Sequence, residues 1–214
     1  MNTIIIDHTL PNVFSQRTDI VSDVWQQEVR LERGHIYLVE ASSGTGKSSL
    51  CSYLIGYRND YQGRFLFDGR DIRSFRTSDW VQLRQRELSH MFQELRLFPE
   101  LTAMENVLIK NQLTGFKTRR QIEDWFDALG IGDKKDVRIG HMSFGQQQRV
   151  AMIRALVQPF HFILADEPIS HLDEENGRIM GQLLIDEARR QGAGVLITSI
   201  GKHMALNYEK TLHL

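Results

Sequence analysis

The sequence predicts an α/β fold with a central, mostly parallel sheet, and two observations carry this prediction. Three runs, at residues 37–39, 162–164 and 195–197, are continuously apolar, which is typical of strands buried on both faces of a parallel sheet. The stretch between about residues 79 and 158 differs, because its apolar side chains recur at helical spacing, for example Ile122, Trp125, Phe126 and Leu129. Together the two patterns indicate a strand-rich core at both ends of the chain and a helical lobe between them.

Further β-type runs complete the expected core. The full set covers residues 4–7, 24–31, 35–40, 64–67, 160–165, 195–199 and 211–214. A chain of 214 residues suits one substantial domain. We therefore expect a single domain over residues 1–214, with a core at about residues 1–80 and 159–214 and a helical lobe at about residues 81–158.

The composition narrows the possible partners and compartments. The net charge is -1, with acids and bases interspersed, which argues against a nucleic-acid partner. A single cysteine, Cys51, rules out an intramolecular disulfide and suits a reducing compartment such as the cytoplasm. No stretch approaches the roughly 18 consecutive apolar residues that a membrane helix requires. We therefore expect a soluble chain whose membrane role, if it has one, comes through a partner.

A glycine-rich turn lies between the strand at residues 37–39 and a helical run at residues 49–54. It reads Ala-Ser-Ser-Gly-Thr-Gly-Lys-Ser-Ser over residues 41–49 and meets the pattern G-x-x-x-x-G-K-[ST], except that its first glycine is Ala41. Glycines let successive backbone N–H groups converge on phosphates, and the start of the following helix adds partial positive charge. The loop therefore predicts a site for a nucleoside triphosphate, namely ATP with Mg²⁺, bound by Ser43, Gly44, Thr45, Gly46, Lys47, Ser48 and Ser49.

Within this loop, two side chains have distinct expected roles. Lys47 supplies a full positive charge to the outer phosphates, and the Ser48 hydroxyl is placed to ligate magnesium. The alternative is a glycine-serine turn with a chance lysine, which the strand–turn–helix context disfavours. If the position of Ala41 requires a positive φ angle, alanine there carries a modest strain.

Two carboxylates follow the apolar strand at residues 162–165. Asp166, at the carboxyl end of a central strand, is expected to reach the magnesium shell, and Glu167 to orient or deprotonate the attacking water. Seen alone, the pair could be an ordinary strand end capped by acids. Its position about 120 residues after the phosphate-binding loop favours the catalytic interpretation.

The segment between these motifs resembles a known family. Residues 142–151 read Met-Ser-Phe-Gly-Gln-Gln-Gln-Arg-Val-Ala, similar to the LSGGQ signature of the ATP-binding cassette (ABC) ATPases, although a Ser-x-Gly-Gln start could also be a simple helix cap. Residues 92–94 resemble the family's Q-loop, 170–173 its D-loop, and 63–72 the strand and turn before its helical lobe. Residues 91–99 and 102–107 are similar to the short ATPases of lipoprotein-release, macrolide-export and cell-division systems.

The resemblance implies an ABC-type P-loop fold with an antiparallel β subdomain and further site residues. Gln93 would be a magnesium and water ligand, and Asp173 would lie at a dimer interface. The signature residues expected to meet the γ-phosphate bound by a second copy are Ser143, Gly145 and Gln146. An aromatic side chain would stack on adenine, with Phe14 as the candidate and Trp25 as the alternative.

Two positions depart from the family pattern. Phe144 occupies a signature position that is normally glycine, so a bulky side chain must point aside or crowd the site. Ser199 follows the strand at residues 195–198 where the family has its switch histidine, and it lacks the charge and reach of an imidazole, although it could still bond a γ-phosphate oxygen. His203 comes four residues later, is expected on the next helix, and is not taken as a substitute. These changes predict slower hydrolysis, not its loss.

The leading functional hypothesis is the ATP-hydrolysing subunit of a transporter. ATP would be bound between the phosphate-binding loop of one copy and the signature of a second, identical or homologous copy, and closure would drive a separate transmembrane permease. The helical lobe and Q-loop would form the docking surface, which places the chain in the cytoplasm at the inner face of the membrane. The alternatives are a nucleotide-switched binding module with little turnover and, less favoured, a soluble ABC protein of translation or DNA repair.

Overall fold

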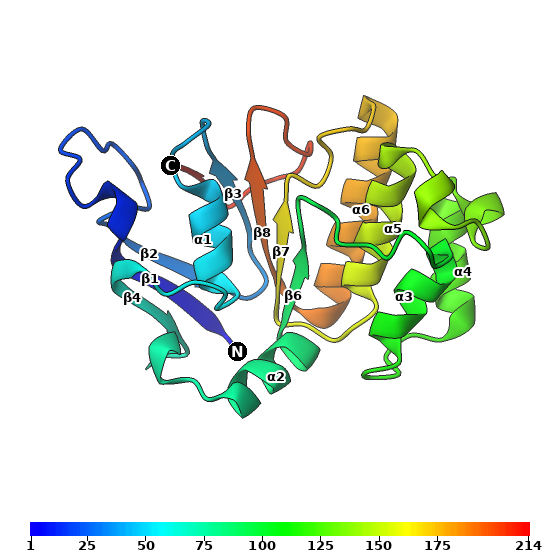
Figure 1. The fold of residues 1–214 in the computed structure, drawn as a ribbon, viewed down its shortest axis with the longest axis horizontal. Helices are drawn as coiled ribbons and strands as arrows, with labels where there is room; N and C mark the ends of the chain where they lie inside the picture. The colour runs from blue at the N-terminus through cyan, green and yellow to red at the C-terminus, as the bar shows by residue number, and fades with distance from the viewer.

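The structure, a computed structural model, describes residues 1–214 and contains two β-sheets. The larger sheet has five strands in the order β6-β7-β8-β3-β9, and every neighbouring pair is parallel. Its strands are β6 (Leu88–Met91), β7 (Phe162–Asp166), β8 (Gly194–Ser199), β3 (Ile36–Glu40) and β9 (Lys210–His213). The carboxyl ends of these strands share one edge, drawn at the top of Figure 1. The predicted α/β class with a parallel central sheet is confirmed.

The smaller sheet is antiparallel and has the order β2-β1-β4-β5. Its strands are β2 (Glu28–Glu32), β1 (Thr3–Pro11), β4 (Tyr61–Phe67) and β5 (Arg70–Asp71). Helix α1 (Lys47–Leu54) lies between the two sheets (Figure 1). Its Leu50 and Tyr53 belong to a buried apolar cluster that also contains Ile6 of β1 and Val39 of β3. The antiparallel subdomain thus covers one side of the helix that follows the phosphate-binding loop.

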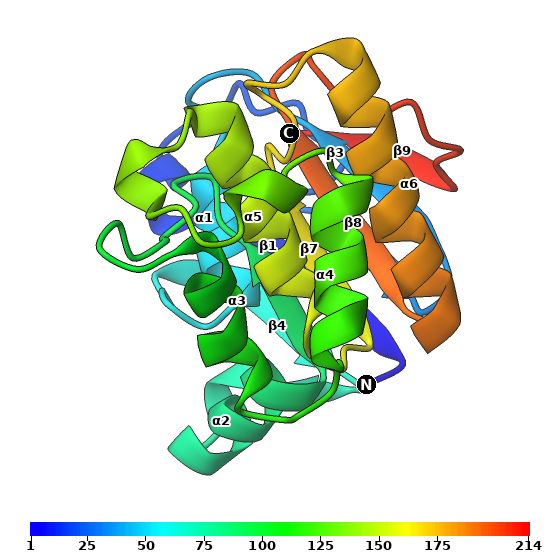
Figure 2. The same ribbon diagram turned by 90° about the vertical axis from the view of Figure 1, so that its right-hand side faces the viewer.

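The remaining helices are α2 (Thr77–Arg86), α3 (Ala103–Asn111), α4 (Arg119–Ala128), α5 (Phe144–Leu156) and α6 (Glu174–Gln191), with short 3-10 turns at Asn12–Phe14, Ile72–Ser74, Gly132–Lys134 and Ile139–His141. Helix α2 packs against β6 and its Leu83 joins the cluster around α1, while α3 to α6 lie on the face of the parallel sheet opposite α1 (Figure 1). A second apolar cluster of 33 buried residues joins α3, α4, α5 and α6 to the sheet. Figure 2 shows α3 and α4 in front of the strands. No helix here has the length and apolar character that a membrane crossing requires.

Two local expectations differ from the structure. Strand β6 was not predicted, because Ser89 and His90 interrupt its apolar run; Ser89 is buried with its hydroxyl donating to the Ala155 carbonyl at 2.5 Å. Conversely, the run predicted as a strand from residue 24 begins only at residue 28, since Gln26 has a φ of 62° in a tight turn. The lobe boundary at residues 81–158 stays a prediction, and β6 within that range belongs to the sheet.

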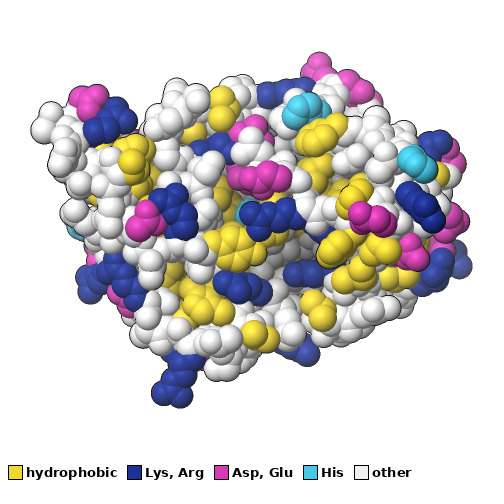
Figure 3. Space-filling view, in the orientation of Figure 1, with side chains coloured by type: hydrophobic (Ala, Val, Ile, Leu, Met, Phe, Trp, Pro, Cys, Tyr) yellow, Lys and Arg dark blue, Asp and Glu magenta, His cyan; other side chains and the backbone are white.

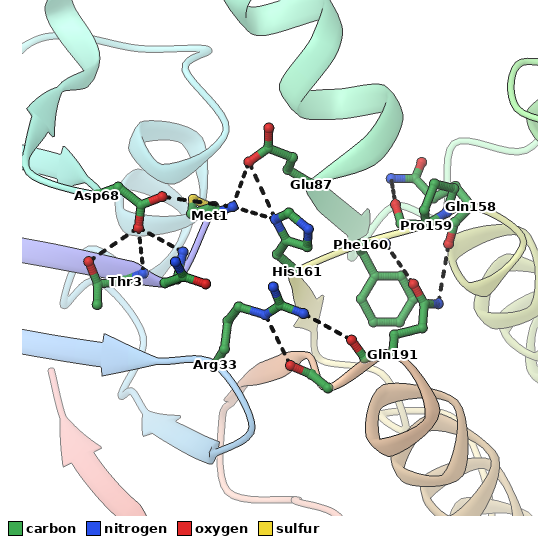
Figure 4. Close-up of polar contacts among 12 residues, drawn as sticks. Met1, Thr3, Arg33, Asp68, Glu87, Gln158, Pro159, Phe160, His161 and Gln191 are labelled. Carbon is green, nitrogen blue, oxygen red and sulfur yellow. Dashed lines mark hydrogen bonds and ion pairs between the residues drawn. The ribbon is translucent and has the colours of Figure 1, made fainter.

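The edge opposite the strand carboxyl ends is held by a polar cluster (Figure 4). The Met1 amino group donates to Glu87 Oε2 at 2.9 Å and also contacts His161 Nδ1. Arg33 donates to the carbonyls of Gln191 and Gly192, both at 3.0 Å. These contacts join β1, the loop after β2, the end of α2 and the segments before β7 and β8, so they fix the two sheets relative to each other.

Candidate nucleotide-binding site

The phosphate-binding loop lies between β3 and α1, as the motif predicts. Gly44 and Gly46 have φ angles of 83° and 99°, in the region that favours glycine. A Cβ atom on Gly46 would lie 2.9 Å from Phe14 Cε2, so the position also has no room for a side chain. Ala41 does not have a positive φ, and its N–H donates to the Ser199 carbonyl at 2.9 Å. The missing first glycine therefore introduces no strain.

Lys47, the first residue of α1, is the centre of the site. Its Nζ lies 2.7 Å from Asp166 Oδ1, 2.8 Å from Glu167 Oε1 and 3.0 Å from Gln93 Oε1. Burial alone lowers the pKa of Lys47, but the hydrogen bonds from its ammonium to Asp166 and Glu167 outweigh burial and raise it. The lysine is therefore firmly protonated, and it brings the phosphate-binding loop, the Q-loop and the end of β7 into one constellation.

The acidic pair is oriented by residues that the sequence did not single out. Thr198, on the neighbouring β8, donates to Asp166 Oδ1 at 2.5 Å. Gln148 of α5 is 1% exposed and donates to the carbonyl of Glu167 at 3.1 Å. Glu167 itself has a φ of 48°, uncommon for a residue with a side chain, and strained backbone of this kind is found at functional sites.

A cavity of about 400 Å³ opens in front of Lys47. It is lined by loop residues and by groups from three other segments, namely Val13, Phe14, Ser42, Ser43, Gly44, Gly46, Lys47, Ser48, Ser49, Gln93 and Ile200. A pocket of this volume suits a small-molecule ligand. The structure thus brings together most of the predicted loop residues with Gln93. Asp166 and Glu167 contact Lys47 but do not line the cavity.

The residues predicted to hold magnesium have suitable chemistry. Ser48 is exposed at the start of α1, and Gln93 and Asp166 both contact Lys47 Nζ, so these two side chains approach the same point. Hydroxyl, amide and carboxylate oxygens are the ligands that Mg²⁺ takes together with phosphate oxygens and water. There is no cluster of three His, Cys, Asp or Glu side chains that could hold a metal ion by itself.

The two adenine candidates differ in their exposure and contacts. Trp25 is 2% exposed and its indole Nε1 donates to the Thr45 carbonyl at 2.8 Å, so it is a core residue that supports the loop. The role of Trp25 as the alternative adenine-stacking residue stays a prediction. Phe14 is half-buried and, together with Arg17, Trp25 and Thr45, lines a second cavity of about 200 Å³. Its stacking role stays a prediction.

The signature segment lies at the start of α5, away from this cavity. Ser143 caps the helix in a reciprocal pair: its N–H donates to Gln146 Oε1 at 2.9 Å, and its Oγ accepts from the Gln146 N–H at 3.3 Å. Gly145 packs closely on the loop after β7, because a Cβ there would lie 3.1 Å from Leu172. Phe144 points outward, 43% exposed, with its ring edge against His171 at a centroid distance of 4.4 Å. The bulky side chain therefore meets no clash within one chain, and its effect on a site shared with a second copy stays a prediction.

The switch and D-loop positions are engaged within the chain. Ser199 is 1% exposed, and its hydroxyl donates to the Lys202 carbonyl. Asp173 caps α6 by accepting from the Asn176 N–H at 2.8 Å. His203 lies in the loop between β8 and β9, not on a helix, with Nδ1 3.4 Å from Glu40 Oε1. The predicted contact of Ser199 with a γ-phosphate and the interface role of Asp173 stay predictions.

The fold and this constellation together define a P-loop nucleotide-binding protein. Residues 26–170 match the family described as ABC transporter. The ATP-binding protein YtrE of Bacillus subtilis is 30% identical over 209 residues, covering 96% of this chain and 90% of that protein. The lipoprotein-releasing system ATP-binding protein LolD of Oleidesulfovibrio alaskensis is 32% identical, covering 86% and 81%.

Longer proteins and solved structures match as well. The macrolide export ATP-binding/permease protein MacB of Wolinella succinogenes is 32% identical over 87% of this chain, which spans only 29% of that protein. The dimeric bacterial ABC transporter cassette MJ0796 superposes with a TM-score of 0.82 at 22% identity, covering 99% of this chain and 94% of that one. The chain therefore belongs to the ABC transporter family, and the predicted ATP-binding, ATP-hydrolysing cassette is confirmed at the level of the family.

Proposed function

We propose that this chain is the ATP-hydrolysing subunit of a transporter and that it works through closure of two copies around ATP. The observation that carries the proposal is the buried Lys47 constellation with Gln93, Asp166 and Glu167. A triphosphate entering the cavity brings negative charge to Lys47 and to the start of α1. Glu167 would then be released from the lysine to take the proton of the attacking water.

Magnesium completes the proposed site. Ser48, Gln93 and Asp166 would hold the ion, which would neutralise charge on the outer phosphates. Thr198 would keep Asp166 in position, since its hydroxyl donates to Oδ1 of that carboxylate. The adenine would stack on Phe14 beside the loop, where an aromatic face contributes about 1 kcal/mol.

The second copy would supply the signature. In the relatives of known structure two cassettes form a dimer. We place Ser143, Gly145 and Gln146 of one copy opposite the phosphate-binding loop of the other, with Asp173 at the interface. Exposed apolar side chains at this edge support such a contact, because Val13 is 71% and Ile200 47% exposed beside the cavity.

A groove beside the Q-loop would dock a separate membrane permease. It has a volume of about 260 Å³ and is lined by Tyr57, His90, Phe92, Arg96, Phe98, Asn106, Ile109, Lys110, Leu113, Arg154 and Ala155. Figure 3 shows hydrophobic and basic side chains around a hollow on this face. Because the groove contains Phe92, the neighbour of Gln93, a docked permease would sense the nucleotide site. The chain would then be cytoplasmic and peripheral at the inner face of the membrane.

Single-turnover hydrolysis tests this function. We expect purified protein with Mg-ATP to release phosphate, and the Glu167→Gln variant to do so roughly 100-fold more slowly, because a general base contributes about 100-fold or more. Equal rates in the two proteins would contradict the proposal. A nucleotide-switched module is the second candidate, since the Ser199 hydroxyl is engaged by Lys202. ATP-bound dimers that persist in the unmodified protein would favour it.

A further inference from the structure

One histidine at the edge that carries the nucleotide site has no assigned role. His171 is exposed in the loop after β7, and its ring is held on two sides. The ring of Phe144 packs against it in a T-shaped arrangement, with an interplanar angle of 62°, and Nδ1 lies 2.9 Å from Ser170 Oγ. Its backbone N–H donates to Gln148 Oε1 at 3.3 Å. An exposed side chain fixed by this many contacts is oriented before any ligand arrives.

The surrounding hydrogen bonds favour the His171 tautomer that carries its proton on Nε2. Gln148 Nε2 donates to Ser170 Oγ at 3.1 Å. The Ser170 hydroxyl proton is then free to be donated to His171 Nδ1. A neutral imidazole that accepts at Nδ1 carries its proton at Nε2. His171 Nε2 makes no hydrogen bond within the chain, so it is a donor that points to an exposed surface.

The same amide connects His171 to the catalytic carboxylate. Gln148 Nε2 also donates to the Glu167 carbonyl at 3.1 Å, and Gln148 is 1% exposed. The backbones of Glu167 and His171 are therefore held by one buried side chain, which reaches the ring of His171 only through Ser170. His171 nevertheless does not line the cavity in front of Lys47 of its own chain.

The nucleotide site of a single chain lacks an imidazole of its own. Ser199 is buried with its hydroxyl donating to Lys202, and His203 is turned to Glu40. Beside the cavity, only Lys47 contributes a cationic side chain, while Ile200 and Val13 contribute exposed apolar ones. Phe144, beside His171, is exposed as well. Exposed apolar side chains therefore lie both beside the cavity and beside His171. This favours a second copy of this chain that would cover both places.

We propose that His171 of each copy is a catalytic residue of the nucleotide site on the other copy. The proposal rests on the two-copy assembly described above. Nε2–H of His171 donates a hydrogen bond to a γ-phosphate oxygen of the ATP held by Lys47 of the partner subunit. As water attacks phosphorus, its oxygen bonds to phosphorus, the bond to ADP breaks, and the proton of the water passes to a carboxylate; His171 stabilises the charge and transfers no proton.

Mixed dimers test whether His171 acts across the interface. Two differently tagged chains are combined so that Lys47→Met leaves only one working nucleotide site. In the first dimer, a Lys47→Met chain pairs with a His171→Ala chain, and the working site faces an intact His171. In the second, a chain with both changes pairs with an unmodified chain, and the working site faces alanine. We expect single-turnover hydrolysis to be 10-fold to 100-fold slower in the second dimer, since one donor to a developing charge contributes about this much or more.

Each other outcome has a definite meaning. A slow first dimer with a fast second one would show that His171 acts within its own chain, and equal rates would show that it has no role; both overturn the proposal. His203→Ala, another exposed histidine, is the matched control and is expected to leave the rate unchanged. ATP affinity, measured by titration with the nucleotide, is expected to change less than threefold on His171→Ala. Absence of hydrolysis in the unmodified protein would instead contradict the proposed function itself.

Discussion

The sheet edge that carries the nucleotide site has two halves, the phosphate-binding loop and the signature segment. They differ in how many of their polar groups already have hydrogen-bond or ionic partners within the chain. On the side of the phosphate-binding loop, Lys47 is 5% exposed and contacts Gln93, Asp166 and Glu167. On the side of the signature, Phe144 is 43% exposed and the outward nitrogen of His171 has no partner. The first half is a closed network within one chain. The second half presents an apolar ring and a hydrogen-bond donor to the outside.

This difference teaches where the departures from the family pattern can be tolerated. A change inside the closed network leaves a buried charge without its partner, which is costly. A change on the outward half alters only the surface that a second copy meets. The side chains of the unusual residues Phe144 and Ser199 make no hydrogen bond or ion pair with Lys47 or its partners. We therefore expect that changes at these two positions alter the rate of ATP hydrolysis without altering the affinity for ATP.

The largest effect is expected from a substitution that disrupts the closed network around Lys47. Lys47→Met removes the cation that neutralises two carboxylates at 2.7 and 2.8 Å. We expect hydrolysis to fall at least 100-fold, and the free energy of unfolding to fall by about 3 kcal/mol because buried acids lose their partner. Phosphate release and urea unfolding measure the two effects. Lys134→Met, which removes a lysine paired with Asp133 on the surface, is the control and should change neither. A fully active Lys47→Met protein would contradict the central role of this lysine.

The sequence predicted the closed half better than the outward half, for physical reasons. The loop, Asp166 and Glu167 belong to contiguous motifs whose geometry follows from one strand, one turn and one helix. Thr198 and Gln148 could not be predicted, because they contact the acidic pair only after β8 and α5 pack beside β7. Similarly, burial of Trp25 depends on packing in a cluster with side chains of the antiparallel sheet, such as Ile6 and Phe65, which spacing along the chain does not show.

A smaller effect is expected when the pH is lowered, and it concerns His90, a half-buried residue of β6 whose two ring nitrogens are covered and have no hydrogen-bond partner. Burial lowers the pKa of His90 to about 4, although the charge of Asp166 opposes this. Because the unfolded chain binds this proton near pH 6.5, stability is lost as the pH falls from 6.5 towards 4, by roughly 3 kcal/mol. We expect His90→Leu to reduce this acid-induced loss in urea unfolding at pH 7 and pH 4.5. His171→Leu replaces an exposed side chain and should leave the acid-induced loss of stability unchanged. An unchanged pH dependence in His90→Leu would contradict the burial argument.

The smallest effect compares two glycines, one packed within the phosphate-binding loop and one in the open loop after β8. Gly46 and Gly201 have φ angles of 99° and 83°, so alanine at either position carries a backbone strain of about 1 kcal/mol or more. Only at Gly46 would the new methyl group also meet side chains, at 2.9 Å from Phe14 and 3.0 Å from Trp25, whereas nothing lies within 4 Å at Gly201. We therefore expect Gly46→Ala to be about 1 to 2 kcal/mol more destabilising than Gly201→Ala, and only Gly46→Ala to weaken ATP binding. Thermal unfolding with and without ATP measures both. Equal losses in the two variants would mean that Phe14 and Trp25 move aside freely, and that the packed half of the site is less rigid than its contacts indicate.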